Sequence, residues 1–353
     1  MDPHSIGLPR IVIIGNNVLE KLPDVCRELG AEKSMLVLCD KTTKEIAGSK
    51  AKELLQNSGI GALMDIVADS TAQEVDRIVA AGNPGIVVAV GGGRVIDVAK
   101  MVAFRKGLPF ISVPTAPSHD GIASERASIS DGRGRYSLRA KPPAAIVADI
   151  GILKNAPPRL IASGAADVIS NYTAVNDWRL ARDDKGEYYS EYAAALSLLS
   201  SEIVIKSASL IREKEERGIR NLVEALVSSG ISMSLVGSSR PASGSEHAFS
   251  HALDVIAAGA GAKPGLHGQQ CGLGAILMAC HQGQDWDSIR DALKAVGSAA
   301  TAGGLGVEKG MVIKALLNAG KVRKRYTILD KKPLSRKSAE DVCMKTGVFN
   351  YDA

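Results

Sequence analysis

The stretch GIVVAVGGGRVIDVAKMVAF, residues 85–104, decides the fold. A run of apolar residues leads directly into Gly91, Gly92 and Gly93, and a helical pattern follows with Asp97 near its start. Glycines at a strand-to-helix turn let a ligand approach the backbone closely, and the helix N-terminus offers unpaired N–H groups to a phosphate. The stretch therefore predicts a turn that binds a pyrophosphate, with a tight turn lacking any ligand as the alternative.

The residues around this turn predict a parallel sheet covered by helices. The turn does not spell GxGxxG, and it follows the fourth expected strand rather than the first, so it departs from the common dinucleotide-binding pattern. Amphipathic stretches at 17–30, 42–59 and 71–82 predict helices between the strands. The expected strands are RIVIIG (10–15), SMLVLCD (34–40), GALMDIV (61–67), GIVVAVGGG (85–93), PFISVPT (109–115) and AAIVADI (144–150).

The composition of the sequence changes near Asn155, where long Ala-, Leu- and Ser-rich stretches with helical periodicity begin. The proline pair in NAPPRLIASG, residues 155–164, favours a boundary at this point. We therefore predict an α/β N-terminal dinucleotide-binding domain with a mainly parallel sheet, residues 1–155. An all-α C-terminal domain, residues 156–353, is expected to bind metal and substrate, with the site in the cleft between the two domains.

Composition narrows the class of protein. The chain has 353 residues, 45% of them apolar and 23% charged, and no window approaches the roughly 20 continuous apolar residues that span a bilayer. The start, MDPHSIGLPR, does not resemble an export signal, so we expect a cytoplasmic protein without stable membrane insertion. Five cysteines without a CxxC pair indicate reduced, mostly buried thiols. The basic run at 321–337 predicts a solvated surface segment flanking a short strand or turn, and no nucleic-acid partner is indicated.

Four side chains in the second predicted domain indicate a metal site. In GSEHAFSHALD, residues 244–254, His247 and His251 lie one helical turn apart and therefore on one face. Asp167 and His267 are further candidates, because a catalytic divalent metal takes three protein ligands and keeps an open position. No local sequence pattern shows that these residues lie close together in space. The remaining histidines are rivals for the site: His4, His119 and His281.

A polar loop, SVPTAPSHDGIASERASI at 112–129, follows the fifth expected strand. Ligands bind outside the carboxyl ends of the strands in open α/β sheets, so this loop is expected beside the glycine turn. Its hydroxyls suit a cofactor and Asp120 suits a substrate hydroxyl, although a plain polar turn is the alternative. Asp40 ends the second strand and could bind an adenosine ribose, whereas Lys41 and Lys44 favour a 2′-phosphate, so NAD and NADP both stay open.

These segments resemble the superfamily of metal-dependent dehydrogenases that includes glycerol dehydrogenase and iron-dependent alcohol dehydrogenase, with dehydroquinate synthase as a related branch. Within it, the sequence is most similar to the sn-glycerol-1-phosphate dehydrogenase family. GGGRVIDVAK, PTAPSHDGIASERASI, GSEHAFSHALD and RYTIL carry the resemblance, which spans nearly the whole chain.

The resemblance implies reduction of dihydroxyacetone phosphate by NADH or NADPH to sn-glycerol 1-phosphate for phospholipid biosynthesis of the archaeal type. It makes Asp167, His247 and His267 the ligands of one divalent metal, with zinc expected. His251 and Asp120 become catalytic residues that bind substrate together with Asp167. The implied cofactor-binding residues are Gly93, Arg94, Val95, Ile96, Asp97, Thr115, Ala116, Pro117, Ser118 and Ser124.

The predicted chemistry is a hydride transfer in which the metal acts as a Lewis acid and His251 is a candidate proton donor. The cations that meet the substrate phosphate are left open among Lys206, Arg159 and Arg126. A polyol dehydrogenase of the same fold, a lyase related to dehydroquinate synthase and a non-catalytic nucleotide-binding module remain as alternatives. A homo-oligomer is expected.

Overall fold

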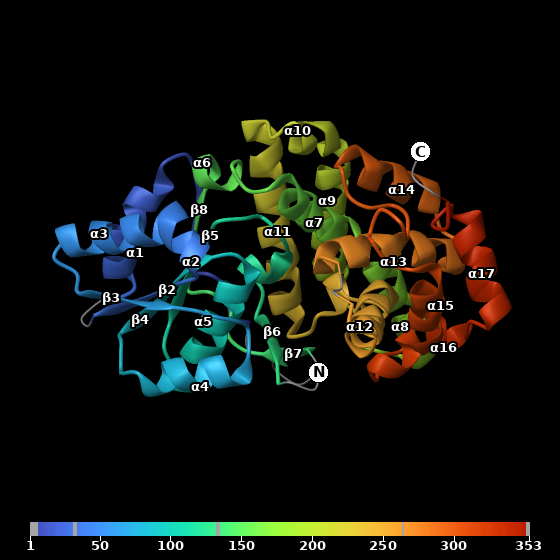
Figure 1. Cartoon of the computed structure of the whole chain (residues 1–353), viewed down its shortest axis with the longest axis horizontal. Coiled ribbons are helices and arrows are strands. Elements are labelled where there is room, and N and C mark those ends of the chain that lie inside the picture. Colours follow the sequence, from blue (N-terminus) through green and yellow to red (C-terminus); the bar gives the residue numbers. More distant parts are fainter. Residues whose placement is uncertain (1–5, 31–33, 132–134, 263–264, 351–353) are drawn as a thin grey trace. The chain divides into compact units, whose positions relative to one another are not determined.

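The computed structural model describes residues 6–30, 34–131, 135–262 and 265–350. The chain divides into two compact units, Met1–Pro157 and Pro158–Ala353 (Figure 1). The first unit is α/β and the second is helical, which confirms the predicted fold class.

A parallel sheet forms the centre of the first unit, and its strand order is β1-β8-β5-β4-β2-β3 (Figure 1). Every side chain of β4, β5 and β8 is buried, which explains why these strands read as continuous apolar runs. All six predicted strands are confirmed. They are β1 (Ile11–Gly15), β2 (Met35–Cys39), β3 (Ala62–Ile66), β4 (Ile86–Gly91), β5 (Phe110–Pro114) and β8 (Ala145–Asp149).

The strand order creates a switch point between β2 and β4. From β2 the chain continues to β3 on one side of the sheet, whereas from β4 it continues to β5 on the other side. Ligands of such sheets bind outside the carboxyl ends of the strands at this point. Those ends are Cys39 of β2, followed by Asp40, and Gly91 of β4, followed by the remaining glycines of the turn.

The helices of the first unit lie where the amphipathic pattern predicts them, although the stretch 17–30 is divided into a 3-10 helix η1 (Val18–Lys21) and α1 (Leu22–Glu28). The stretch 42–59 is not one helix: α2 (Lys41–Thr43), a π-helical turn η2 (Lys44–Gly48) and α3 (Ser49–Asn57) follow one another. An antiparallel hairpin of β6 (Arg126–Ser130) and β7 (Arg135–Arg139) was not predicted. The other helices are α4 (Ala72–Ala80), α5 (Gly93–Lys106), η3 (Asp120–Ile122) and α6 (Ile150–Leu153).

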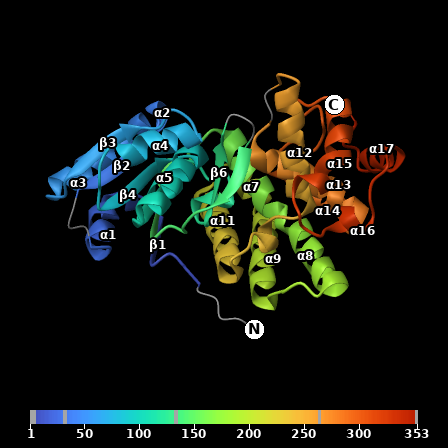
Figure 2. The ribbon, with the colours of Figure 1, turned by 90° about the horizontal axis from the view of Figure 1, so that it is seen from below.

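The second unit contains helices and no strand among its described residues. Helix α9 packs against both α11 and α8, and the three lie side by side in Figure 2. The helices are α7 (Pro158–Ile169), α8 (Asn171–Lys185), α9 (Glu191–Lys206), α10 (Ala208–Arg212), α11 (Glu216–Val236), η4 (Arg240–Ala242), α12 (Ser245–Gly259), α13 (His267–Gln282), α14 (Trp286–Ala295), α15 (Lys309–Val322), α16 (Ile328–Lys331) and α17 (Arg336–Lys345).

Helix α11 has the length and composition of a membrane span, with a mean hydropathy of 1.2 over its best window. However, 61% of that window is buried inside the protein, including Leu222, Leu226 and Met233. Burial on this scale is typical of a core helix, since a helix surrounded by other helices is apolar on most of its faces.

The burial of the five cysteines predicts which thiol reacts with a reagent in solution. Burial raises the pKa of Cys26 and Cys343 to about 12 and that of Cys39 to about 11, and it raises the pKa of Cys271 well above its usual value. Only Cys280 among the five is partly exposed. Burial also raises the pKa of Cys280, but because this thiol is the one that a reagent can reach, the native protein at pH 8 should react with a disulfide reagent at Cys280 alone. A Cys280→Ser variant should lose this reaction, and rapid modification of two or more thiols would contradict the burial.

Candidate metal and dinucleotide sites

Three helices of the second unit bring the predicted metal-binding side chains together. Asp167 lies on α7, His247 on α12 and His267 at the start of α13. Two glycines of α13 permit this packing. A Cβ on Gly268 would lie 2.0 Å from the carbonyl oxygen of Ser163 on α7, and one on Gly274 would lie 2.8 Å from the carbonyl oxygen of Glu246 on α12. Small residues at these positions therefore set the separation of the helices.

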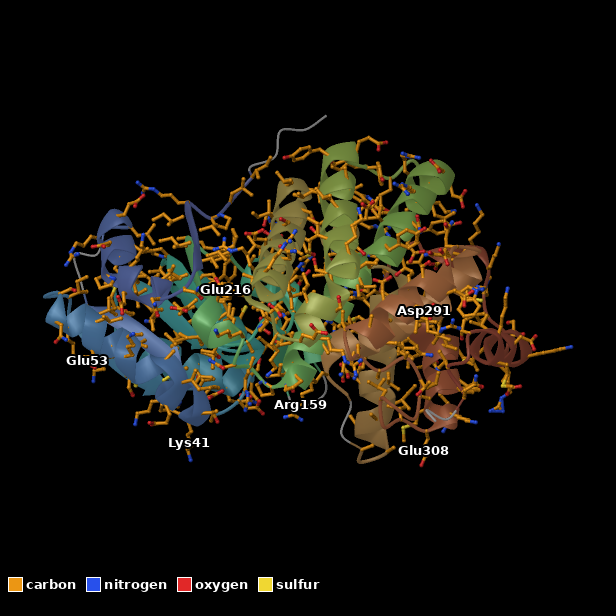
Figure 3. The ribbon with its side chains drawn as sticks, turned by 90° about the horizontal axis from the view of Figure 1, so that it is seen from above. Lys41, Glu53, Arg159, Glu216, Asp291 and Glu308 are labelled. Carbon is orange, nitrogen blue, oxygen red and sulfur yellow. The ribbon has the colours of Figure 1, made fainter. Side chains whose placement is uncertain are left out.

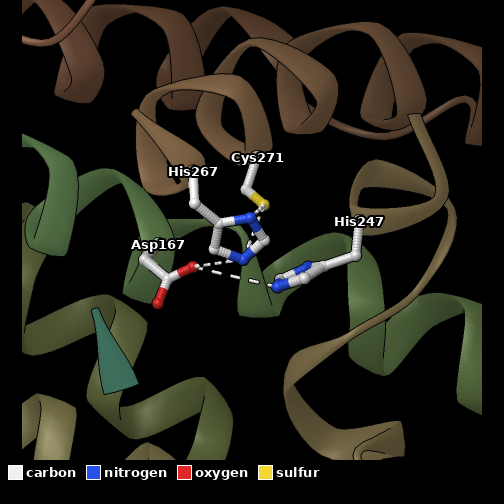
Figure 4. A group of neighbouring side chains, drawn as sticks. All are labelled: Asp167, His247, His267 and Cys271. Atoms are coloured by element: carbon white, nitrogen blue, oxygen red, sulfur yellow. Dashed lines mark hydrogen bonds and ion pairs between the residues drawn. The ribbon is translucent and has the colours of Figure 1, made fainter. Parts of the chain in front are cut away.

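The carboxylate of Asp167 faces a ring nitrogen of each histidine (Figure 4). Its Oδ1 lies 3.8 Å from Nε2 of His247 and 3.9 Å from Nε2 of His267. The Asp167 and His247 side chains are only 3% and 11% exposed, whereas His267 is 41% exposed and open on one side. One carboxylate oxygen and two imidazole nitrogens form a donor set that suits a divalent ion with an open position. The residues present therefore fit the predicted metal.

Glu246 sets the orientation of the His247 ring. The Nδ1 of His247 lies 2.9 Å from Oε1 of Glu246, and the same oxygen accepts the N–H of Gly244 at 2.6 Å. A carboxylate oxygen can only accept hydrogen bonds, so the Nδ1 that faces it carries the proton of the ring. This leaves Nε2 unprotonated toward Asp167. Burial raises the pKa of Glu246, whereas hydrogen bonds from the Gly244 N–H and the Thr173 hydroxyl lower it and favour the carboxylate, and burial holds the pKa of His247 well below its usual value. His247 is therefore neutral, as a metal ligand must be.

A chain of side-chain hydrogen bonds sets the orientation of the His267 ring. Gln270 donates from Nε2 to Asp254 and to the carbonyl of Gly265, both at 3.0 Å, so its Oε1 is the acceptor for the Ser250 hydroxyl at 2.8 Å. That hydroxyl has one proton and has donated it. At 3.3 Å it can then only accept from Nδ1 of His267, which again leaves Nε2 unprotonated.

Cys271 also lies in the cluster, although the sequence predicted only a reduced, buried thiol there. It follows His267 by one turn of α13, and the four ligand atoms of Asp167, His247, His267 and Cys271 lie within 4.8 Å of one another. A metal bound to Nε2 lies on the side of that nitrogen away from the ring. A second ligand of the same metal must therefore be much farther from Nδ1 than from Nε2. The Cys271 Sγ is 3.6 Å from Nε2 and 3.9 Å from Nδ1 of His267, so it lies beside the ring and not in a ligand position.

His251 has a different environment from His247. Its Nε2 accepts a hydrogen bond from Nη2 of Arg323 at 2.8 Å, because a guanidinium can only donate. Burial and the Arg323 charge hold the pKa of His251 well below its usual value, so the ring is neutral with its proton on Nδ1. The expectation that the basic run is a solvated surface segment is therefore wrong for Arg323, and it is wrong for Arg325, which donates to the carbonyl of Ser243 at 2.6 Å.

The rival histidines lie elsewhere among the described residues. His119 belongs to the first unit, and the Nε2 of His281 lies 2.7 Å from the carbonyl oxygen of Lys332. His4 lies outside the described residues.

The three phosphate-binding candidates also occupy separate places. Lys206 is exposed and pairs with Glu202, while the carbonyl of Arg126 accepts from Lys100 in the first unit. Arg159 is exposed in the first turn of α7, where Figure 3 labels it.

In the first unit the glycine turn leads from β4 into α5 beside the switch point of the sheet. Gly92 is the N-cap residue of α5 and has no side-chain cap, and a Cβ placed there would meet no atom within 4 Å. The start of α5 thus has no side-chain cap and has open space beside Gly92, which suits a phosphate. Val95 and Ile96 have fully buried side chains, so only their backbone could contribute to binding.

Gly93 has a packing role that the sequence analysis missed. A Cβ on Gly93 would lie 1.9 Å from Nε2 of His119, and one on Gly121 would lie 2.1 Å from Cε1 of the same ring. The imidazole is thus held between two glycines, and its Nδ1 accepts the N–H of Gly121 at 2.9 Å. This contact fixes the loop that carries Asp120 against the start of α5.

The other predicted cofactor-binding residues lie around this turn. Thr115 follows β5 and donates its N–H to the carbonyl of Gly91 at 3.1 Å. Thr115, Ala116, Pro117 and Ser124 are buried, Ser118 is half-buried, and Arg94 is exposed. Asp40 accepts the N–H of Thr43 at 2.8 Å as the cap of α2, so its carboxylate has a structural role at the switch point.

Lys100 is a buried lysine that the sequence analysis did not name. Its side chain is 0% exposed, lies 3.8 Å from the carboxylate of Asp97 and donates to the carbonyl of Arg126 at 2.6 Å. Burial lowers the pKa of Lys100, whereas the charges of Asp97 and Asp120 raise it. An Asp and a Lys three positions apart within the otherwise apolar stretch 95–103 of α5 were the signal for this pair.

Metal analysis of alanine variants tests the ligand set. His247→Ala should lose bound metal because one of three ligands is removed, whereas His251→Ala and Cys271→Ser should retain a stoichiometric ion. The measurement is metal per chain after dialysis against a weak chelator. Metal loss in His251→Ala would give both α12 histidines the same role, and metal loss in Cys271→Ser would make the thiol a ligand.

A pair of glycine variants separates ligand binding from packing in the turn. Gly92→Val should keep the Tm of the wild type, because its side chain meets open space, but should raise the Kd for NAD(P)H at least tenfold by obstructing the phosphate. Gly93→Ala should lower the Tm by several degrees through its clash with His119, and the double variant Gly93→Ala/His119→Ala should recover part of it. An unchanged Kd in Gly92→Val would argue against a cofactor phosphate at this turn.

Comparison with known proteins shows full-length relatives. The chain is 50% identical to a protein named glycerol-1-phosphate dehydrogenase [NAD(P)+] from Methanothermobacter thermautotrophicus, over 99% of this chain and 100% of the relative. It is 46% identical to the protein of the same name from Pyrococcus horikoshii, over 98% of this chain and 100% of the relative. Residues 13–157 match the family model for iron-containing alcohol dehydrogenase.

Solved structures share the fold. A glycerol dehydrogenase from Schizosaccharomyces pombe has a TM-score of 0.82 at 18% identity, covering 98% of this chain and 91% of its own. A probable glycerol dehydrogenase from Sinorhizobium meliloti has a TM-score of 0.78 at 19% identity, covering 97% and 98% of the two chains. Sequence identity this low shows only that the fold is shared. By its close full-length relatives, the chain belongs to the glycerol-1-phosphate dehydrogenase family, which confirms the resemblance seen in its motifs.

Proposed function

We propose that this chain reduces dihydroxyacetone phosphate to sn-glycerol 1-phosphate with NADH or NADPH, in the synthesis of archaeal-type membrane phospholipids. The observation that carries the proposal is the cluster of Asp167, His247 and His267, with both imidazole Nε2 atoms turned toward one carboxylate oxygen. The relatives' name supports the substrate and the cofactor class.

The second unit supplies the groups that hold and polarise the ketone. Asp167, His247 and His267 would hold one divalent metal, and such an ion acts as a Lewis acid toward a carbonyl oxygen. Glu246 and Ser250 keep the two rings in the ligand tautomer, so the site needs no proton rearrangement before it binds the ion. The 41% exposure of His267 leaves this side of the cluster accessible to substrate.

The first unit supplies the dinucleotide site. The backbone N–H groups of Gly93, Arg94 and Val95 at the start of α5 are assigned to the pyrophosphate, and the loop containing Thr115, Ser118 and Ser124 is assigned to the remainder of the cofactor. A bound nicotinamide supplies the hydride. Asp97, paired with buried Lys100, is assigned to hold the start of α5 in place.

The reduced carbonyl needs one proton in addition to the hydride. His251 is neutral and has its proton on Nδ1, since Nε2 accepts from Arg323. We assign His251 the hydrogen bond from Nδ1 to the reacting oxygen or to a water beside it, with the net proton drawn from solvent. Asp120 is assigned a hydrogen bond with a substrate hydroxyl. Zinc as the metal, a homo-oligomeric state and a cytoplasmic location are further parts of the proposal.

A polyol dehydrogenase is the second candidate, because the solved structures with this fold include glycerol dehydrogenases. The two activities differ in whether the substrate carries a phosphate. A lyase related to dehydroquinate synthase would instead use its cofactor without net consumption.

Steady-state kinetics distinguishes these functions. The metal-loaded protein should oxidise NAD(P)H with dihydroxyacetone phosphate at a kcat/KM at least 100-fold above that for dihydroxyacetone, because a phosphate adds charge-assisted hydrogen bonds to binding. The product should be the sn-1 enantiomer, checked with stereospecific glycerol phosphate enzymes. Equal kcat/KM for the two ketones would support the polyol dehydrogenase, and no cofactor oxidation with either would support the lyase.

A further inference from the structure

A pocket of about 330 Å³ lies in the second unit and shares no lining residue with the metal cluster. It is bounded by the start of α7, the end of α10, the first turn of α13 and the residues that follow α14. Its size is within the range of small-molecule sites. Within the described part of the chain no Asp or Glu lines it, and its polar side chains are Arg159, Arg212, Lys214 and Gln269. An excess of positive charge without carboxylates favours an anionic ligand.

The groups that a ligand can reach in this pocket are mainly polar. Ile161 and Ile211 also line it, but they are at most 2% exposed. In contrast, Arg159 and Arg212 are exposed and Gln269 is half-buried; Arg159 is labelled in Figure 3. A ligand therefore meets guanidinium and amide groups rather than an apolar wall.

These polar side chains have few partners of their own. Among the described residues, the side chains of Arg159 and Gln269 form no hydrogen bond and no ion pair. Arg212 donates from Nη1 to the carbonyl oxygen of Lys294 at 3.0 Å, and no described carboxylate pairs with it. A backbone carbonyl orients a guanidinium without cancelling its charge. Both guanidinium groups are therefore available to an anion.

The pocket is separate from the place where the proposed substrate would react. Gln269 follows His267 by two residues, which is roughly 200° around the axis of α13, so the two side chains lie on different faces of the helix. Arg159 precedes Asp167 by eight residues on α7, which is roughly 12 Å along that helix. In dihydroxyacetone phosphate only three covalent bonds separate the phosphorus from the carbonyl carbon. A substrate carbonyl at the cluster therefore leaves Arg159 out of reach of the substrate phosphate.

We propose that this pocket binds a phosphate monoester between Arg159 and Arg212, as an anion site distinct from the active site. A guanidinium offers parallel N–H donors that match two oxygens of a phosphate. The phosphate of a monoester carries nearly two negative charges at neutral pH, which two guanidinium groups balance. The amide of Gln269 can donate to a further oxygen. The pocket volume exceeds what a phosphate group alone needs, which leaves room for the organic part of the ester.

Titration calorimetry with phenyl phosphate tests the proposal on the metal-loaded protein at constant ionic strength. Arg159→Ala and Arg212→Ala should each raise the Kd of one bound equivalent about tenfold, because each removes charge-assisted hydrogen bonds, and the double variant should lose that equivalent. The Tm of each variant checks its fold, and Arg159→Ala should keep the wild-type Tm since this side chain has no described partner. Lys294→Ala is the matched control: Lys294 is exposed beside the pocket but does not line it, so binding should stay as in the wild type.

Two further measurements define the chemistry of the site. Inorganic phosphate should compete with phenyl phosphate for the same equivalent. Because both guanidinium groups are exposed to solvent, the affinity should also fall as the concentration of NaCl rises. Competition by inorganic phosphate without any binding of phenyl phosphate would contradict a site for an ester.

The result that overturns the inference is unchanged phenyl phosphate binding in both arginine variants, or an equal loss in Lys294→Ala, which would indicate diffuse surface charge. Without added anion, kcat/KM for dihydroxyacetone phosphate should be the same in Arg159→Ala and in the wild type. A loss confined to the phosphorylated ketone would place Arg159 at the substrate and would also overturn the inference. Because calorimetry needs no turnover, failure of the proposed function would leave the binding result interpretable.

Discussion

The structure of the metal cluster depends on hydrogen bonds to the ring nitrogens that face away from it. Nδ1 of His247 is held by Glu246 and Nδ1 of His267 by Ser250, and in both rings this leaves Nε2 as the basic atom toward Asp167. A buried imidazole without such a partner could rotate or exchange tautomers, and each change would remove a ligand atom. The contact between Glu246 and Gly244, and the one between Ser250 and Gln270, therefore matter to the site although neither includes a ligand.

Much of this architecture could be predicted because it follows from local patterns. Continuous apolar runs gave the buried parallel strands, and the spacing of four placed His247 and His251 on one face of α12. The assembly of Asp167 with His247 and His267 could not be derived locally, because the glycine contacts that draw α13 against α7 and α12 involve backbone atoms far apart in the chain. Resemblance to a family supplied that step.

Other features could not be predicted because the same residues fit two surroundings. A run of arginines and lysines predicts a solvated segment whether its side chains are exposed or half-buried. Only the structure shows that Arg323 contacts His251 while Lys324 stays exposed. Cys271 has the spacing of a ligand relative to His267, yet its sulfur lies beside the ring. Likewise, three successive glycines suggest one purpose, whereas Gly92 faces open space and Gly93 faces the ring of His119.

The position of the His119 ring between Gly93 and Gly121 has an evolutionary consequence. Each glycine is required only while an imidazole fills the space next to it, because a Cβ at either position would overlap the ring. A lineage that replaces His119 by a small residue releases both glycines from this constraint, whereas a lineage that first gains a side chain at either glycine must displace the histidine. The three positions should therefore covary among relatives, independently of any selection on cofactor binding.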